Sequence, residues 1–187
     1  MRILMVNASP KKNGATEQVL QWMKEALEEQ YETESVCLGE QSIAFCRGCK
    51  QCYKTGWCVL PADGVEELLH RMERNDAILF AVPSYWGDVP AQFKALIDRC
   101  TPYADTNSLP GHPHPAAGKR VFAAALRAGG RTGECEHLLQ CVEHWSGHMG
   151  AEYDGGVMLT HVDGKEDLTL EQEVSVKSAV NAWISKK

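Results

Sequence analysis

Apolar positions along the chain form two patterns, short continuous runs and longer stretches with helical spacing. The runs at residues 3–6, 77–82 and 121–126 are bounded by turn residues, as expected of parallel strands covered on both faces. Residues 31–38 alternate more weakly, which predicts an edge strand. Residues 156–160 predict a fifth strand.

A stripe of apolar residues at helical spacing follows each predicted strand. Asp63 and Glu66 match a capping box that opens the second helix, and Pro90 suits the first turn of the third. The stripes consist of Val19, Leu20, Met23 and Leu27; Val65, Leu68, Leu69 and Met72; Phe93, Leu96, Ile97 and Cys100; Leu138, Leu139 and Val142; and Val176, Ala179, Val180, Trp183 and Ile184.

Strands that alternate with helices predict a five-stranded parallel sheet with helices on both faces, a doubly wound α/β fold. With 187 residues the chain has the length of one domain, so we expect residues 1–187 to form a single unit. Residues 40–61 and 103–118 match no element, and long loops in compact domains often carry function.

Charge and hydropathy narrow the classes of partner. The formal charge of −6 and the lack of a basic stripe argue against nucleic acid. The apolar run near the N-terminus is too short for a signal-peptide core, and no stretch approaches the ~20 apolar residues of a membrane span. We therefore expect a cytoplasmic protein with no membrane partner.

Half of the eight cysteines lie within thirteen residues of the loop 40–61. A chain with this much core is unlike the small disulfide scaffolds of secreted proteins. The scattered cysteines, which we expect to be buried thiols, are Cys37, Cys100, Cys135 and Cys141. The clustered cysteines are Cys46, Cys49, Cys52 and Cys58.

The clustered cysteines admit three interpretations. Four thiolates in so compact a run match the ligand set of a [4Fe–4S] cluster. A structural zinc ion also takes four thiolates, but its sites usually have two separated C-x2–4-C arms. The third interpretation is a set of metal-free, redox-sensing thiols.

The segment after the first predicted strand has the composition of a phosphate site. Its hydroxyl, basic and glycine residues precede a helix, whose positive N-terminus and free N–H groups favour anions. It matches neither a Walker loop nor G-x-G-x-x-G, which disfavours a nicotinamide-type dinucleotide fold. Plain helix caps are the other interpretation. The candidate residues are Ser9, Lys11, Asn13, Gly14 and Thr16.

Two further turns follow the third and fourth predicted strands, at the carboxyl ends where ligands bind in such sheets. The first holds two aromatic residues suited to flank a planar ring, and glycines in both permit close backbone approach. Packed surface turns are the alternative. The candidate residues are Pro83, Ser84, Tyr85, Trp86, Gly87, Gly129 and Gly130.

The histidines suggest a metal site only weakly. His112 and His114 lie in a proline-rich loop, whereas His137, His144 and His148 fall on one helical tract. No H-E-x-x-H motif accompanies them. We therefore interpret them as solvated or packed side chains.

Three segments together resemble the NAD(P)H-dependent FMN reductases of flavodoxin-like fold, and specifically the iron–sulfur flavoproteins. They are the phosphate-loop motif Ser9-Pro10-x3-Gly14-x-Thr16, the cysteine run, and Pro83-x-Tyr85-x-Gly87-x3-Ala91-x2-Lys94-x3-Asp98-Arg99. The resemblance covers most of the chain. We expect Asp98 and Arg99 to serve structural pairing or a subunit contact rather than catalysis.

The resemblance implies an FMN site and a cluster site. Ser9, Lys11 and Thr16 would contact the FMN phosphate, residues 83–86 would border the isoalloxazine near residues 129–130, and the clustered cysteines would ligate a [4Fe–4S] cluster. Family members are homo-oligomers, here a dimer or tetramer, with the cluster facing the flavin of a neighbouring subunit. The redox donor would be NAD(P)H or a ferredoxin.

The chain departs from the family pattern at a few positions. Lys11 replaces a frequent arginine, which keeps the charge but loses the bidentate fork. Ala8 and Ala15 replace a glycine and an asparagine, and residues 61–63 replace paired aspartates. Flavin binding remains the expectation.

The sequence thus predicts an FMN-binding electron-transfer oxidoreductase, a single flavodoxin-like domain with a cysteine-rich loop at 40–61. The flavin handles two electrons and the cluster one, and the cofactors perform the chemistry. No residue is an evident general acid or base. Two alternatives stay open, an NAD(P)H-dependent FMN or quinone reductase without a cluster, and a non-enzymatic structural-zinc or thiol-sensing protein.

Overall fold

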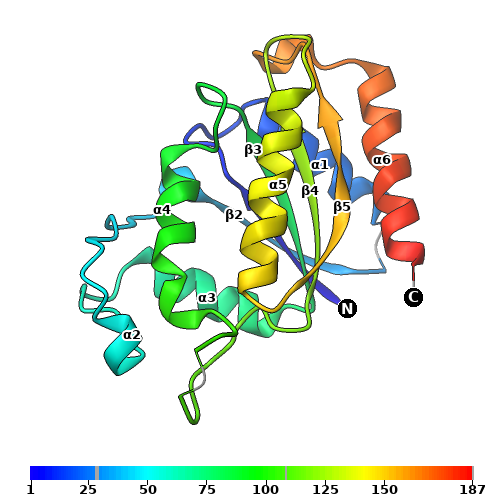
Figure 1. The fold of residues 1–187 in the computed structure, drawn as a ribbon. Helices are drawn as coiled ribbons and strands as arrows, with labels where there is room; N and C mark the ends of the chain where they lie inside the picture. The colour runs from blue at the N-terminus through cyan, green and yellow to red at the C-terminus, as the bar shows by residue number, and fades with distance from the viewer. Residues whose placement is uncertain (28–29, 108, 187) are drawn as a thin grey trace.

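The computed structural model describes residues 1–27, 30–107 and 109–186, so residue 108 of the second long loop lies outside the described residues. A parallel sheet of five strands in the order β2-β1-β3-β4-β5 forms the centre of the molecule (Figure 1). This is the flavodoxin-like strand order, and the predicted fold is confirmed. The strands are β1 (Arg2–Asn7), β2 (Glu32–Cys37), β3 (Ala77–Pro83), β4 (Arg120–Leu126) and β5 (Glu152–Leu159).

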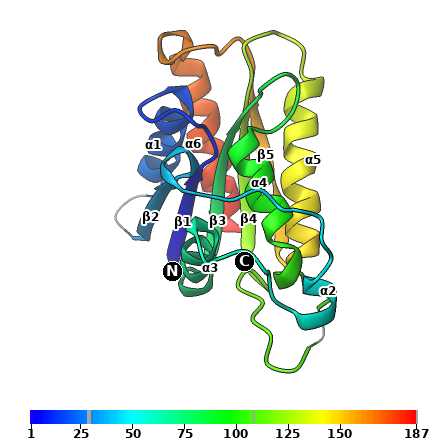
Figure 2. The ribbon, with the colours of Figure 1, turned by 90° about the vertical axis from the view of Figure 1, so that its left-hand side faces the viewer.

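Helices cover both faces of the sheet, as predicted (Figure 1, Figure 2). One face packs against α1 (Ala15–Ala26) and α6 (Leu170–Ser185). The other packs against α3 (Gly64–Arg74), α4 (Ala91–Arg99) and α5 (Gly133–His148). Within the described ranges, none of the helices has the length and apolar character needed to cross a membrane.

The sheet separates two hydrophobic cores because successive side chains of a strand point to opposite faces. Leu4 and Val6 of β1 pack on the side of α3, α4 and α5. Ile3 and Met5 pack on the side of α1 and α6. The continuous apolar run that the sequence shows here is therefore a strand buried on both faces.

The structure tests three local predictions, which concern a helix cap, a proline and the start of a strand. The Asp63 carboxylate accepts from the Val65 N–H at 3.0 Å and Glu66 accepts from the Asp63 N–H at 2.7 Å, which confirms the capping box. Pro90 is the N-cap of α4, so its predicted place inside the first turn was wrong by one position. The fifth strand begins at Glu152 rather than 156, because an edge strand is only partly covered and needs no continuous apolar run.

The loop 40–61 contains a helix that the sequence did not predict, α2 (Cys52–Thr55), too short to show an apolar period. Figure 2 shows the loop crossing over α4 to reach α2. The second loop begins with a 3-10 turn at Thr101–Tyr103. Both α2 and the second loop lie at the end of the sheet opposite the carboxyl ends of the strands (Figure 1).

The scattered cysteines divide into two pairs. Cys100 and Cys135 are buried, as predicted. Cys37 and Cys141 are partly exposed, so the prediction was wrong for them. Cys37 ends the edge strand β2, and Cys141 lies on the flank of α5, where neighbouring elements cover a side chain incompletely.

Candidate functional site

The loop between β1 and α1 is held in shape by its own side chains. The Ser9 N–H donates to Asn7 Oδ1 at 3.0 Å, and the Lys11 N–H donates to Ser9 Oγ at 3.0 Å. Asn13 has a φ of 59°, in the left-handed region that asparagine tolerates better than most residues. Its N–H donates to the Glu17 carboxylate at 2.6 Å, so the loop binds an anionic oxygen from its own helix.

The same loop has the features that an FMN phosphate requires. Gly14 is the N-cap of α1, and no side chain forms a capping bond to the first turn. Ser9 and Thr16 are each only 4% exposed, so their hydroxyl groups have little freedom to rearrange. The Glu17 carboxylate on the Asn13 N–H marks a position that suits a phosphate oxygen. The predicted residues therefore share one loop at the N-terminus of α1.

The turn after β3 presents two aromatic side chains to solvent. Tyr85 and Asp88 close it through paired backbone hydrogen bonds of 2.9 and 3.1 Å. Between them, Trp86 and Gly87 have φ values of 56° and 79°, the signs found in a type I′ turn. Trp86 is fully exposed at 105% and Tyr85 is 44% exposed. The two aromatic side chains are therefore accessible to a ligand or to a second chain.

Ser84 connects this turn to the loop after β4. Its N–H donates to the Leu126 carbonyl at 2.7 Å and its hydroxyl donates to Glu134 at 2.7 Å. Glu134 in turn pairs with Arg127 at 3.0 Å. Arg127 and Glu134 were not predicted from the sequence, although a charged residue directly after a buried strand and one in the first turn of the next helix were available signals.

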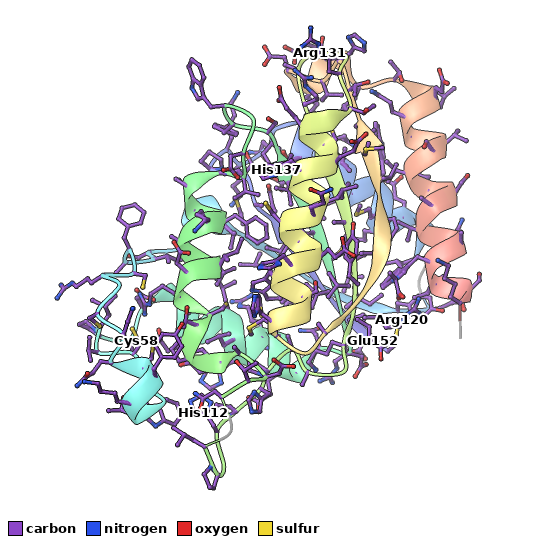
Figure 3. All side chains as sticks on the ribbon, in the orientation of Figure 1. Cys58, His112, Arg120, Arg131, His137 and Glu152 are labelled. Carbon is purple, nitrogen blue, oxygen red and sulfur yellow. The ribbon has the colours of Figure 1, made fainter. Side chains whose placement is uncertain are left out.

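Gly129 and Gly130 leave space that the side chains of Arg127 and His161 occupy. The expectation was that these glycines would let a ligand approach the backbone. A Cβ at Gly129 would lie 2.4 Å from the Arg127 guanidinium, and one at Gly130 would lie 2.7 Å from the His161 ring. The His161 N–H donates to the Gly129 carbonyl at 3.2 Å. The two glycines thus allow Arg127 and His161 to pack closely, while Ala128, Gly130 and Arg131 stay exposed. Arg131, at its tip, lies at the carboxyl edge of the sheet (Figure 3).

The loops after β1 and β3 meet at the point where the strand order reverses. β1 lies between β2 and β3, so the chain leaves β1 and β3 toward opposite faces. Ligands of open α/β sheets bind at this switch point, outside the carboxyl ends. The structure thus brings the predicted phosphate and ring residues to one edge.

The four clustered cysteines line one pocket of about 200 Å³ beside the C-terminal end of α4 (Figure 3, where Cys58 is labelled). Left-handed residues make the tight turns between them, with φ of 61° at Gly48, 56° at Lys50 and 80° at Gly56, which ends α2. The Gly48 N–H donates to Cys46 Sγ at 3.4 Å. Such a bond stabilises negative charge on sulfur.

Arg99 supplies a buried positive charge to this pocket. Its side chain is 1% exposed, and Nη1 donates to Asp63 at 2.7 Å and to the Ala44 carbonyl at 3.0 Å. Among the described groups, its Nε and Nη2 have no hydrogen-bond partner, and Nη2 faces only Glu66 at 3.6 Å. The predicted structural role of Arg99 is confirmed, and its unpaired donors suit an anionic group.

A positive charge near the four thiols favours their deprotonated form. Burial raises the pKa of the Cys52 thiol, and negative charge on Cys46 and Cys58 raises it further. A fully deprotonated set of thiolates therefore needs compensation from Arg99, which lines the same pocket.

The sulfur atoms of the cysteine pocket are more widely spaced than the ligand atoms around a single bound ion. Among the described residues, the group of three His, Cys, Asp or Glu donor atoms that lie within 4.8 Å of one another consists of Asp88, His137 and Cys141. No three sulfurs of the cysteine pocket therefore lie within 4.8 Å of one another. Zinc–sulfur bonds of about 2.3 Å would place tetrahedral sulfurs roughly 3.8 Å apart.

The cysteine pocket and the aromatic turn lie at opposite ends of α4. Pocket residues include Asp98, Arg99 and Thr101 at the helix C-terminus, whereas the turn precedes the helix. Nine helical residues separate them by roughly 13 Å. The two predicted sites therefore do not meet within one chain.

Comparison with protein families gives a clear match. The family model described as NADPH-dependent FMN reductase matches residues 1–162. An iron–sulfur flavoprotein of Methanosarcina thermophila is 32% identical over 147 residues, 78% of this chain and 72% of that protein. One from Archaeoglobus fulgidus is 35% identical over 112 residues, 59% of this chain and 50% of its own length. One from Methanocaldococcus jannaschii is 35% identical over 103 residues, 54% of this chain and 53% of that protein.

The matched regions thus span about half the length of the second and third of these relatives. Solved structures add the fold. A flavone reductase has a TM-score of 0.74 at 15% identity, covering 97% of this chain and 61% of that one. The NAD(P)H:quinone oxidoreductase from Methanothermobacter marburgensis has a TM-score of 0.73 at 18% identity, covering 100% of this chain and 98% of that one. At these identities the likeness concerns the fold alone.

Proposed function

From the chain's membership of the NADPH-dependent FMN reductase family, and within it of the iron–sulfur flavoproteins, we propose that it binds FMN and passes electrons between FMN and a [4Fe–4S] cluster. As a member it is a flavin-dependent oxidoreductase. When bound, the flavin supplies two-electron and the cluster one-electron chemistry. The observation that carries the proposal is the pocket that joins four thiols to a buried guanidinium.

The FMN phosphate would be held by the loop after β1. The N–H groups of the first turn of α1 and the hydroxyl groups of Ser9 and Thr16 would donate to its oxygens, with Lys11 as the nearby cation. The Glu17 carboxylate, which now accepts from the Asn13 N–H, would move aside. The loop offers a single phosphate site without the G-x-G-x-x-G fingerprint of dinucleotide-binding folds, which favours FMN over FAD.

The isoalloxazine would lie against the turn after β3. Trp86 and Tyr85 offer apolar faces that exclude water from one side of the ring. Ser84 is held by Glu134 and the backbone of β4, so the turn has a fixed distance from the loop at 129–130. The chain's role here is to orient the ring and to exclude solvent.

The cluster would be ligated by Cys46, Cys49, Cys52 and Cys58. The negative charge of four thiolates would be balanced by the Arg99 guanidinium, whose Nε and Nη2 have no hydrogen-bond partner among the described groups. Asp63 fixes the guanidinium in place while it also caps α3. The cysteine loop is thereby connected to the core of the domain.

Electron transfer between the two sites would take place between subunits. Because α4 separates the cysteine pocket from the aromatic turn, a second copy of the chain would bring its own turn to the pocket. A homo-oligomer, with NAD(P)H or a ferredoxin as the donor, would therefore complete the electron path.

Anaerobic purification with quantification of iron, sulfide and released flavin tests the proposal. We expect one FMN and about four irons per chain, with broad absorption beyond that of the flavin. Cys49→Ala should lose the iron and keep the flavin, whereas Cys37→Ala, which changes a thiol outside the pocket, should keep the iron. FMN without iron after reconstitution would leave a cluster-free reductase, and neither cofactor would defeat the proposal.

A further inference from the structure

A second group of metal-type side chains lies between the aromatic turn and α5, away from the cysteine pocket. His137 Nε2 is 3.3 Å from Asp88 Oδ1 and 3.7 Å from Cys141 Sγ. All three donor atoms lie within 4.8 Å of one another. Figure 3 labels His137 beside this turn.

The three side chains reach this place for separate structural reasons. His137 and Cys141 are one turn apart on α5, so they project from the same face of the helix. Asp88 closes the turn after β3, and its Oδ1 also accepts from the Val89 N–H at 2.7 Å. That bond orients the carboxylate as outer hydrogen bonds orient metal ligands.

The two distances from His137 match the edges of a coordination tetrahedron. With bonds of about 2.0 Å to nitrogen and oxygen and about 2.3 Å to sulfur, tetrahedral geometry places N and O about 3.3 Å apart and N and S about 3.5 Å apart. The observed separations are 3.3 Å and 3.7 Å. An ion would therefore need little movement of these side chains.

Without a metal the arrangement has little purpose. The Asp88 and His137 side chains are 63% and 47% exposed, and ion pairs at such exposure contribute little to stability. The same exposure leaves them accessible to an ion from solvent. Imidazole, thiolate and carboxylate together are the donor types of zinc and similar transition metals.

We propose that Asp88, His137 and Cys141 bind a divalent transition-metal ion of the zinc class. Three protein ligands leave one position open, as in zinc sites that take a water or a small ligand. All three side chains line a pocket of about 720 Å³ between α4 and α5. Because Asp88 closes the turn that carries Tyr85 and Trp86, a bound ion also fixes this turn to α5.

A pair of imidazoles in the same pocket offers a second place where a metal ion could bind, for comparison with the proposed site. His144 and His148 lie one helical turn apart on α5, with their Nε2 atoms 3.1 Å apart. Two imidazoles without a third donor make a weaker site. The proposal therefore assigns the tighter binding to the Asp88, His137 and Cys141 set.

The test is a titration of the full-length chain with Zn²⁺ alone against a chromophoric chelator. Cys49→Ser and Cys52→Ser are included throughout, so that the cysteine pocket does not take the ion. We expect one tight site per chain. His137→Ala and Cys141→Ser should each weaken it by at least roughly tenfold, the loss that even an outer partner of a ligand brings.

Asp88→Asn keeps the shape of the side chain and should weaken binding as well, and circular dichroism checks that each variant is folded. The double variant His144→Ala/His148→Ala should retain the tight site. The proposal is overturned if His137→Ala and Cys141→Ser bind Zn²⁺ as the parent does. It is equally overturned if only the His144→Ala/His148→Ala variant loses the tight site.

Discussion

His112 places its Nε2 atom 2.6 Å from the carbonyl oxygen of Gly56, a residue far away in the sequence. The contact joins the two long loops of the domain. The imidazole is buried, and its ring centroid lies 4.6 Å from that of Trp57 in the cysteine loop. Gly56 has a φ of 80°, and a Cβ there would lie 2.4 Å from Leu109. The second loop thus supports the conformation of the first.

His112→Ala should loosen the cysteine loop without unfolding the domain. The variant loses one hydrogen bond, worth about 1 kcal/mol, and the ring contact with Trp57. We expect faster tryptic cleavage at Lys50 or Lys54 and a lower iron content after reconstitution. His70→Ala, a change at an exposed helix position, is the control. Equal protection and equal iron in both variants would show that the loop does not depend on His112.

Arg99→Gln should destabilise the apo domain strongly. It removes one partner of a buried ion pair and leaves Asp63 with two backbone N–H donors as its remaining partners. We expect a loss of roughly 3 kcal/mol, at the low end for buried pairs because Asp63 is partly exposed. Urea unfolding measures it, and Lys94→Gln, which breaks an exposed pair with Asp98, should change the stability by less than about 1 kcal/mol. A similar small change in both would contradict the structural role of Arg99.

Stability should fall in acid partly through Asp63. Burial raises the pKa of this carboxyl, but the N–H groups of Ala44 and Val65 and the Arg99 guanidinium outweigh burial and hold the pKa below its ordinary value of 3.8. The stability that the ionised Asp63 carboxylate contributes is therefore present above pH 3.8. It is lost as the pH falls through the lower pKa that Asp63 has in the folded protein.

The measurement is urea unfolding at neutral pH and near the folded pKa. Asp63→Asn should be less stable than the wild type at neutral pH and should show a smaller further loss in acid. Asp98→Asn, at an exposed pair, should follow the wild type. An unchanged acid response in Asp63→Asn would refute the assignment.

Ser9→Ala with Thr16→Ala should weaken FMN binding by more than tenfold, since a hydrogen bond to a charged group contributes roughly 1.5–3 kcal/mol. Flavin fluorescence titration gives the dissociation constants. Ser178→Ala, an exposed hydroxyl on α6, is the matched control. If the double variant binds FMN as tightly as the control, the phosphate lies elsewhere.

Trp86→Gly should separate folding from flavin binding. A non-glycine residue at a φ of 56° is strained, so glycine there should not destabilise the domain and should gain up to about 1 kcal/mol. Loss of the indole should alter the fluorescence and reduction potential of bound FMN, and Trp86→Phe should restore part of the effect. A melting temperature well below the wild type, with unchanged flavin properties, would make Trp86 a structural residue only.

Local interactions let the sequence alone specify the elements and their order. The run at residues 3–6 predicted a strand buried on both faces, and the Asp63–Glu66 pair predicted the start of α3, because periodicity and capping involve neighbouring residues. Alternating strands and helices then left a doubly wound sheet as the natural fold. The same locality explains why the cysteine run and the loop at 9–16 were recognised.

Only the tertiary structure decided which distant side chains meet. Ser84 and Glu134, Arg99 and Asp63, and the Asp88, His137 and Cys141 set come from separate elements, and their contacts depend on the register of β3 against β4 and on how α4 and α5 pack. From the sequence alone His137 was therefore interpreted as solvated or packed, since its partner Asp88 lies on another loop. Contacts of this kind arise from the packing of the whole sheet, which no local pattern encodes.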